Sequence, residues 1–73
     1  MITDRQRALL LAVRDKWDEA DRGPTVKELS KSLKLSYAGT DYNIRTAVGA
    51  GWLQRVPGRH HDLRLTEDGL AAL

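Results

Sequence analysis

Helix start signals recur in this sequence at a spacing that leaves little chain between the second and third helices. Thr3 and Thr25 each precede, by three residues, a Gln or Glu that completes a capping box, and Ser36 suits the same N-cap position. The apolar residues that follow recur every three or four positions, as in helices packed on one side. The predicted helices cover residues 3–20, 26–33 and 37–49, with about three residues between the second and the third.

The hydrophobic period changes after Gly51. Residues 52–56 have strand character, Pro57-Gly58 is a turn signal, and residues 62–65 form a returning strand, so residues 52–65 are predicted to be a hairpin. Thr66 is the N-cap candidate of a last helix over residues 67–73, whose acidic first turn suits the positive end of the helix dipole. Leu70 and Leu73 are expected to seal this helix onto the core.

These elements predict an α+β, mostly α fold: a three-helix core, a β-hairpin wing and a short C-terminal helix, in one domain over residues 1–73. The order helix, helix, short turn, helix, hairpin is that of a winged helix-turn-helix. The expected inward stripes are Leu9, Leu10, Val13 and Trp17 on the first helix, Val26, Leu29 and Leu33 on the second, and Thr40, Ile44, Ala47 and Val48 on the third.

Charge is unevenly distributed along the chain. The net charge is only +2, yet residues 22–64 hold eight basic and three acidic side chains, which gives that segment +5. This is the part of the chain suited to a polyanion. The chain has no cysteine, and its apolar run LLLAV is too short to span a bilayer and lacks a signal-peptide cleavage pattern. A cytoplasmic protein that does not engage a membrane is expected.

Residues 2–65 resemble the DNA-binding domain of LexA repressors. The resemblance lies in ITDRQRALLLAVRD at the first helix, GPTVKELSKSL at the second and GWLQRVPGRHHDLRL at the wing, whereas the ending LTEDGLAAL resembles the wing-to-helix exit of MarR-type regulators. The resemblance implies a transcriptional regulator whose third helix enters the major groove and whose wing lies along the DNA backbone. Two departures, a shorter turn before the third helix and Ala38, Asp41 and Tyr42 at the groove face, prevent the operator from being carried over.

The outward face of the third helix is small and polar, with two long side chains. Arg can bind guanine O6 and N7 in a bidentate pair, and methyl groups can contact thymine. Gly39 and Gly49 each weaken the helix by about 1 kcal/mol relative to Ala, which suggests a close approach of DNA or of another helix. The residues predicted to contact DNA from this helix are Ser36, Tyr37, Ala38, Gly39, Tyr42, Arg45 and Thr46.

A second set of residues is predicted to hold phosphates. Lysines recur along the outer face of the second helix, and a basic triplet occupies the wing tip. A solvated charged face or an exposed loop without a partner is the alternative interpretation. A metal site is not expected, because the two adjacent histidines diverge in an extended strand and no further His or Cys completes a ligand shell. The phosphate-contacting set is Thr25, Lys27, Lys31, Lys34, Arg59, His60 and His61.

The sequence thus predicts a sequence-specific binder of double-stranded DNA, of bacterial or phage type, that contacts about four to six phosphates per monomer. No catalytic constellation, cofactor motif or small-molecule site is expected, so the chain is not predicted to be an enzyme. A homodimer through the terminal helices is possible. The alternative function is a winged-helix module for protein–protein contact, which an exposed apolar patch at Leu11, Trp52, Leu70 and Leu73 would favour.

Overall fold

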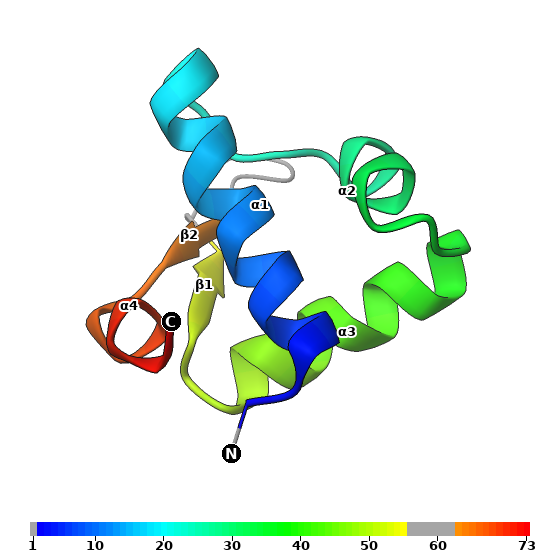
Figure 1. Ribbon diagram of the computed structural model, residues 1–73. Coiled ribbons are helices and arrows are strands. Elements are labelled where there is room, and N and C mark those ends of the chain that lie inside the picture. The colour runs from blue at the N-terminus through cyan, green and yellow to red at the C-terminus, as the bar shows by residue number, and fades with distance from the viewer. Residues whose placement is uncertain (1, 56–62) are drawn as a thin grey trace.

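The computed structural model describes residues 2–55 and 63–73 as a compact, mostly helical α+β domain (Figure 1). Three helices precede a two-stranded antiparallel hairpin, and a short helix follows it. The elements are α1 (Asp4–Ala20), α2 (Val26–Leu33), α3 (Tyr37–Gly49), β1 (Leu53–Arg55), β2 (Leu63–Leu65) and α4 (Glu67–Ala72). The fold class predicted from the sequence is confirmed, and α2 and α3 have the predicted ranges. The turn predicted at residues 57–58 lies outside the described residues.

Side-chain caps define where the helices begin. The hydroxyl of Thr3 accepts a hydrogen bond from the Gln6 N–H, and the Gln6 side chain accepts one from the Thr3 N–H, each at 3.1 Å. Thr25 and Glu28 form the same reciprocal pair at the start of α2. Both capping boxes are therefore confirmed, and each satisfies two N–H groups that would otherwise lack partners.

Left-handed residues end the first three helices. Asp21 and Lys34 adopt this conformation with φ of 54° and 56°, and Gly51 does so with φ of 84°. Asp21 takes the left-handed position directly after the last helical residue of α1, two residues before Gly23, although glycine is the residue that adopts this conformation most readily. Gly51 does terminate α3: its N–H donates to the Val48 carbonyl, and the backbone then turns into β1.

The core is built around α1. Leu9, Leu10 and Val13 are fully buried on one face of this helix. In Figure 1, α2 and α3 lie on one side of α1, while the hairpin and α4 lie on the other. Each of these layers places buried apolar side chains against α1, including Leu29 from α2 and Ile44 from α3. Burial of this single face therefore fixes the relative positions of α2, α3 and the hairpin.

The hairpin is joined to α1 through Trp17. In the antiparallel register Leu53 pairs with Leu65 and Arg55 with Leu63, so that Leu53 and Leu63 point into the core. The indole Nε1–H of Trp17 donates a 2.6 Å hydrogen bond to the carbonyl oxygen of Leu63. A two-stranded hairpin is marginally stable alone. Packing and this hydrogen bond hold it against the helical core.

The short helix α4 docks through a glycine. The backbone of Gly69 lies against the carbonyl of Trp52, where a Cβ atom would come within 2.9 Å of the carbonyl carbon. The Thr66 N–H also donates to the Trp52 carbonyl at 3.1 Å, and its hydroxyl donates to the Gly51 carbonyl. Because Gly69 has no side chain, α4 can pack closer to Trp52, the residue before β1, than it could with any other residue at this position.

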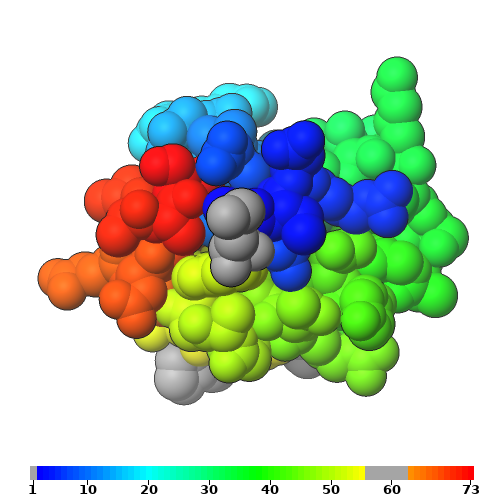
Figure 2. Space-filling view, turned by 60° about the horizontal axis from the view of Figure 1, so that its bottom comes forward, coloured from blue at the N-terminus to red at the C-terminus, as the bar shows by residue number. Residues whose placement is uncertain are grey.

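One predicted contact of α4 is wrong. Leu73 packs against the core, as expected, but Leu70 is 59% exposed. The reason is that Gly69 occupies the buried position of this one-and-a-half-turn helix, so the next residue turns outward. Figure 2 shows the face of the domain on which α4 (red) and the α2–α3 unit (green) flank the start of α1 (blue). None of the helices in the described part of the chain is long and apolar enough to cross a membrane.

Two glycine substitutions test this packing. Gly69→Ala should lower the free energy of unfolding by about 1–3 kcal/mol, the usual cost of overpacking, because the carbonyl of Trp52 cannot move without breaking its bond to Thr66. Gly49→Ala is the matched control, since no atom lies within 4 Å of its added Cβ and helix propensity should raise stability by up to about 1 kcal/mol. Urea unfolding measures both, and equal effects of the two changes would contradict the docking of α4.

Candidate nucleic-acid interface

An exposed stripe runs the length of α3, opposite the side chains that it buries. Thr40, Ile44 and Ala47 are fully buried, as predicted. The exposed residues recur at positions 38, 42, 45 and 49, which is the spacing of one helix face. Tyr42, 65% exposed, and Arg45 are its only long side chains. The backbone of α3 is therefore covered only by small residues at Ala38 and Gly49, and Tyr42 and Arg45 project from the surface between them.

The N-terminus of α3 presents backbone N–H groups to solvent. The Ser36 hydroxyl accepts a hydrogen bond from the Gly39 N–H at 3.0 Å, which confirms Ser36 as the N-cap. The first N–H groups of a helix have no acceptor within the helix, and those of Tyr37 and Ala38 stand at this exposed end. The Tyr37 side chain is 57% exposed. This end can therefore meet an anion, as the sequence predicts.

Two predicted residues of α3 have roles within the helix. Gly39 is half-buried, and a Cβ there would lie 3.3 Å from the hydroxyl oxygen of Ser36. Thr46 is half-buried, and its hydroxyl donates to the Tyr42 carbonyl at 2.9 Å. Of the two expected reasons for Gly49, a close approach of another helix of the described chain does not apply, because no atom lies within 4 Å of an added Cβ; a close approach of DNA stays a prediction.

The lysines predicted to hold phosphates are exposed beside α3. Lys27 and Lys31 lie one turn apart on α2, which packs directly against α3. Lys34 is also exposed, but it is the left-handed C-cap rather than part of the helix. Only Lys27 and Lys31 therefore share the helical spacing that the sequence predicts for all three lysines. The third lysine lies in the turn that leads to the start of α3.

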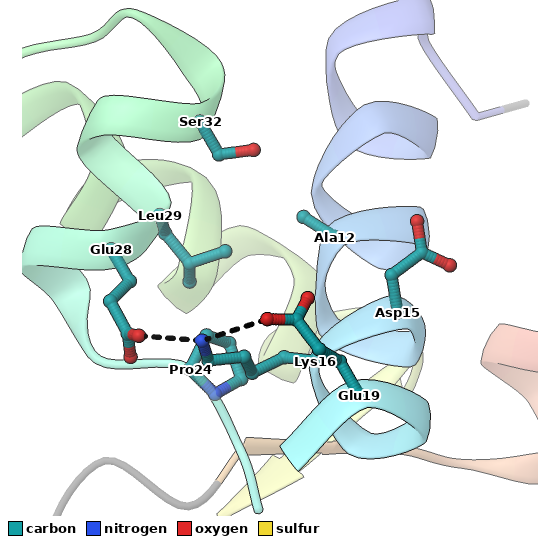
Figure 3. A pocket seen from close by; sticks show the side chains of 8 residues that line it. All are labelled: Ala12, Asp15, Lys16, Glu19, Pro24, Glu28, Leu29 and Ser32. Atoms are coloured by element: carbon teal, nitrogen blue, oxygen red, sulfur yellow. Dashed lines mark ion pairs between the residues drawn. The ribbon is translucent and has the colours of Figure 1, made fainter.

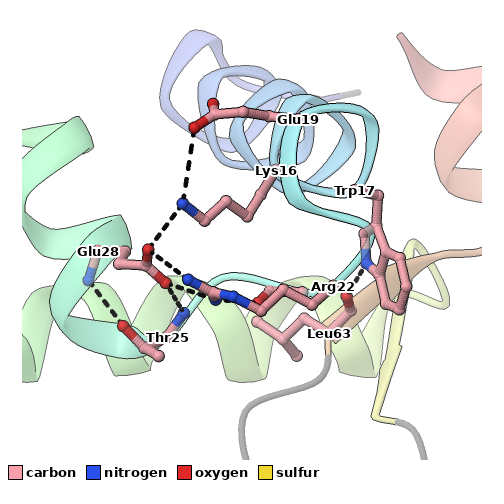
Figure 4. A network of polar contacts seen from close by, with 8 residues as sticks. Lys16, Trp17, Glu19, Arg22, Thr25, Glu28 and Leu63 are labelled. Atoms are coloured by element: carbon pink, nitrogen blue, oxygen red, sulfur yellow. Dashed lines mark hydrogen bonds and ion pairs between the residues drawn. The ribbon is translucent and has the colours of Figure 1, made fainter.

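The N-terminus of α2 is occupied by a network of polar contacts (Figure 4). The two terminal nitrogens of Arg22 donate to the two carboxylate oxygens of Glu28, at 2.9 and 3.0 Å. Lys16 of α1 contributes an ion pair to the same carboxylate at 2.8 Å. The Thr25 N–H donates to Glu28 as well, at 2.9 Å. Thr25 was predicted to contact a phosphate, but Glu28 already accepts the hydrogen bond from its N–H.

These donors lower the pKa of the Glu28 carboxyl well below its usual range. The hydrogen bonds from Arg22 contribute most, followed by those from Lys16 and from the Thr25 backbone. Glu28 therefore stays ionised and joins the end of α1 to the start of α2. Arg22 neutralises this carboxylate. The positive charge of Arg22, which counts toward the +5 of residues 22–64, is therefore already compensated within the protein.

A shallow groove lies between α1 and α2 beside this network (Figure 3). Lys16 lies across it, 80% covered, with Glu28 at 2.8 Å and Glu19 at 4.0 Å. Asp15 lines the α1 side, and Leu29 and Ser32 line the α2 side. Three carboxylates around one lysine make the groove unsuited to phosphate, so the phosphate-binding candidates are the lysines on the outer face of α2.

Arg64 also has an intramolecular partner. Its guanidinium carbon lies 4.4 Å from the centroid of the Trp17 ring, a cation–π distance. Arg55, in contrast, is exposed at the end of β1. The basic side chains exposed on α2, its C-cap and β1 are thus Lys27, Lys31, Lys34 and Arg55.

The predicted wing-tip residues belong to the segment between β1 and β2. Arg59, His60 and His61 lie outside the described residues. Within residues 2–55 and 63–73, no three His, Cys, Asp or Glu side chains gather as metal ligands would.

Comparison with known proteins identifies no family: no family model matches this chain, and no curated protein does. The structure supports the coarser feature of the resemblance, namely three helices followed by an antiparallel hairpin, a topology consistent with a winged helix.

The Glu28 network predicts a specific loss of stability in acid. A carboxyl whose pKa is lowered by folding stabilises the protein above its unfolded pKa, about 4.3, and this contribution is lost as the pH falls below that value. Glu28→Gln should therefore cost about 1 kcal/mol at neutral pH. The difference from the parent should narrow between pH 5 and pH 3, as followed by urea unfolding at each pH.

Glu19→Gln is the matched control, because Glu19 is 75% exposed and lies 4.0 Å from Lys16. It should change the free energy of unfolding by less than about 0.5 kcal/mol at any pH. A Glu28→Gln variant that is as stable as the parent at pH 7, or whose difference from the parent does not depend on pH, would contradict the role assigned to Glu28.

Proposed function

We propose that this domain binds double-stranded DNA sequence-specifically, as a transcriptional regulator of bacterial or phage type. In this proposal α3 enters the major groove, and α2 and the hairpin contact the sugar-phosphate backbone. The observation that carries it is the exposed stripe of α3, small apart from Tyr42 and Arg45, beside a helix with exposed lysines. The winged-helix-like topology and the resemblance to LexA and MarR regulators support the same function.

The shape of α3 supports entry into the groove. The major groove admits one α-helix, and base edges lie at its floor. Ala38 and Gly49 keep the outer surface of α3 low, so its backbone can approach the base edges closely. Tyr42 and Arg45 then extend toward the bases, while the N-terminus at Ser36 faces the phosphates at the rim.

The charge distribution supports a division between holding and reading. Lysines contact phosphates as point charges and position a protein without selecting a sequence. Lys27, Lys31 and Lys34 supply such charges at the α2 side of α3, and Arg55 supplies one at the hairpin side. Phosphate contacts on both sides of α3 would orient it along the groove.

The first test is the dependence of DNA affinity on salt. About four phosphate contacts release counterions on binding, so the logarithm of the binding constant should fall against the logarithm of salt with a slope of about −3 to −4. The binding constant is measured by fluorescence anisotropy of a labelled duplex between about 50 and 200 mM salt, where counterion release changes the affinity strongly. An affinity that does not change over this range would contradict the proposal.

A second test separates residues that read from residues that hold. Tyr42→Ala should relax base preference at particular positions of sites selected from a random duplex pool, while Lys31→Gln should weaken all sequences alike and reduce the salt slope by about 0.9. Arg14→Gln is the control of equal charge change, because Arg14 lies on α1 beside Trp17, away from α2 and α3. It should alter neither quantity. An Arg14→Gln effect as large as that of Lys31→Gln would place the DNA on a different surface.

A second candidate function is a protein–protein contact through α4. The observation that favours it is Leu70, a residue of α4 that is 59% exposed. Helix α4 lies on the side of α1 opposite α2 and α3 (Figure 1). The rest of the apolar patch that would support this function is reduced, since Trp52 and Leu73 are half-buried against the core and Leu11 is half-buried on α1. A second copy of the chain could use the same surface while α3 binds DNA. Failure of the parent to bind any duplex at low salt would favour this second function.

A further inference from the structure

Asp41 and Arg45 form an ion pair on the exposed side of α3. Nε of Arg45 lies 3.0 Å from Oδ2 of Asp41, one turn earlier in the helix. The Arg45 side chain is 70% exposed and that of Asp41 is 45% exposed. Asp41 is the only acidic residue of α3, and it lies beside the only basic one. The pair therefore leaves this helix without net charge, in contrast to the lysines of α2.

The geometry of the pair leaves one end of the guanidinium open. Nε stands at the inner end of the planar group, and Nη1 and Nη2 form a two-donor fork at its outer end. A carboxylate at Nε restrains the plane of the group from the helix side. The outer fork can then meet two acceptors at once, as guanine O6 and N7 present in the major groove.

The charge of Asp41 decides between the two possible targets of Arg45. An Arg that contacts phosphates gains from a strongly positive surrounding, whereas a carboxylate 3.0 Å away opposes the approach of another anion. Guanine carries no net charge, so its O6 and N7 acceptors, which bear only partial negative charges, are repelled less than a phosphate. The pair therefore suits base reading by Arg45 better than phosphate contact.

We propose that Asp41 is a positioning residue that orients Arg45 to recognise a guanine in the major groove. This inference rests on the proposed function, because it requires α3 to lie in the groove. It assigns Asp41, which the sequence interpretation did not include among the contact residues, a role in specificity. Arg45 makes the contact, and Asp41 acts through it.

The pair can be altered without unfolding the domain. An exposed i,i+4 ion pair contributes little to helix stability, and both side chains point away from the core. Variants at these positions should therefore fold like the parent, as circular dichroism and urea unfolding can verify. Their effects on DNA binding can then be attributed to the interface.

The test is a double-mutant cycle scored by base preference. Sites selected from a random duplex pool by the parent identify the preferred guanine, and affinities are then measured for duplexes with each of the four base pairs at that position. Arg45→Ala should abolish the preference, which a bidentate contact sets at about 5- to 150-fold. Asp41→Asn should reduce it about two- to fivefold, and Asp41→Glu, which keeps the carboxylate, should retain most of it.

The double variant Asp41→Asn/Arg45→Ala shows whether Asp41 acts through Arg45. Its base preferences should equal those of Arg45→Ala at every position. Asp18→Asn, an equal charge change on α1, should leave the preference intact. These results would support the positioning role, since loss of a negative charge alone changes the affinity for all sequences together.

Three results would overturn the inference. If the base preference of the double variant differs from that of Arg45→Ala, Asp41 contacts a base itself, for example the cytosine N4 amino group. An Arg45→Ala variant that binds all duplexes more weakly, with the salt slope reduced by about 0.9, would make Arg45 a phosphate contact. Either result leaves DNA binding by the domain in place. Absence of binding by the parent to every duplex at low salt would overturn both this inference and the proposed function.

Discussion

The buried face of α1 organises the core of this domain. Leu9, Leu10 and Val13 are fully buried, and they receive side chains from α2 and α3 on one side and from the hairpin on the other. In a domain of 73 residues this shared core is the main source of stability. It also sets the geometry of the candidate interface, because α2 and α3 pack on α1 as well as directly on each other, which places the stripe of α3 beside the lysines of α2.

The helical part of the fold was predictable because its signals are local. Capping boxes at Thr3 and Thr25 and the N-cap at Ser36 act over three residues, and the inward stripes follow the helix period. The docking of α4 was not predictable, since it depends on the absence of a side chain at Gly69 opposite the Trp52 carbonyl, 17 residues earlier in the chain. For the same reason Leu70 was wrongly assigned to the core. Leu70 and Leu73 are the large apolar residues of this segment, and the sequence does not show that Gly69 faces inward instead of Leu70.

The candidate site was predictable as a face but not as a set of partners. Outward positions of α3 follow from the helix period, which gave Ala38 and Tyr42 correctly as exposed. The pair of Asp41 and Arg45 had a local signal, the i,i+4 spacing of opposite charges, that the interpretation of α3 did not use. The bonds of Arg22 and Lys16 to Glu28 join different elements, so only the tertiary structure reveals which basic residues already have carboxylate partners.

DNA binding through α3 can be tested by an NMR titration of the ¹⁵N-labelled domain with a mixed-sequence duplex at low salt. It locates the DNA on the surface without assuming which residues bind. We expect backbone chemical shifts to change along the outer stripe of α3, at its N-terminus near Ser36 and around Lys27 and Lys31, while those of α4 remain unchanged. Shift changes confined to α4 around Leu70, with α3 unaffected, would contradict DNA binding through α3.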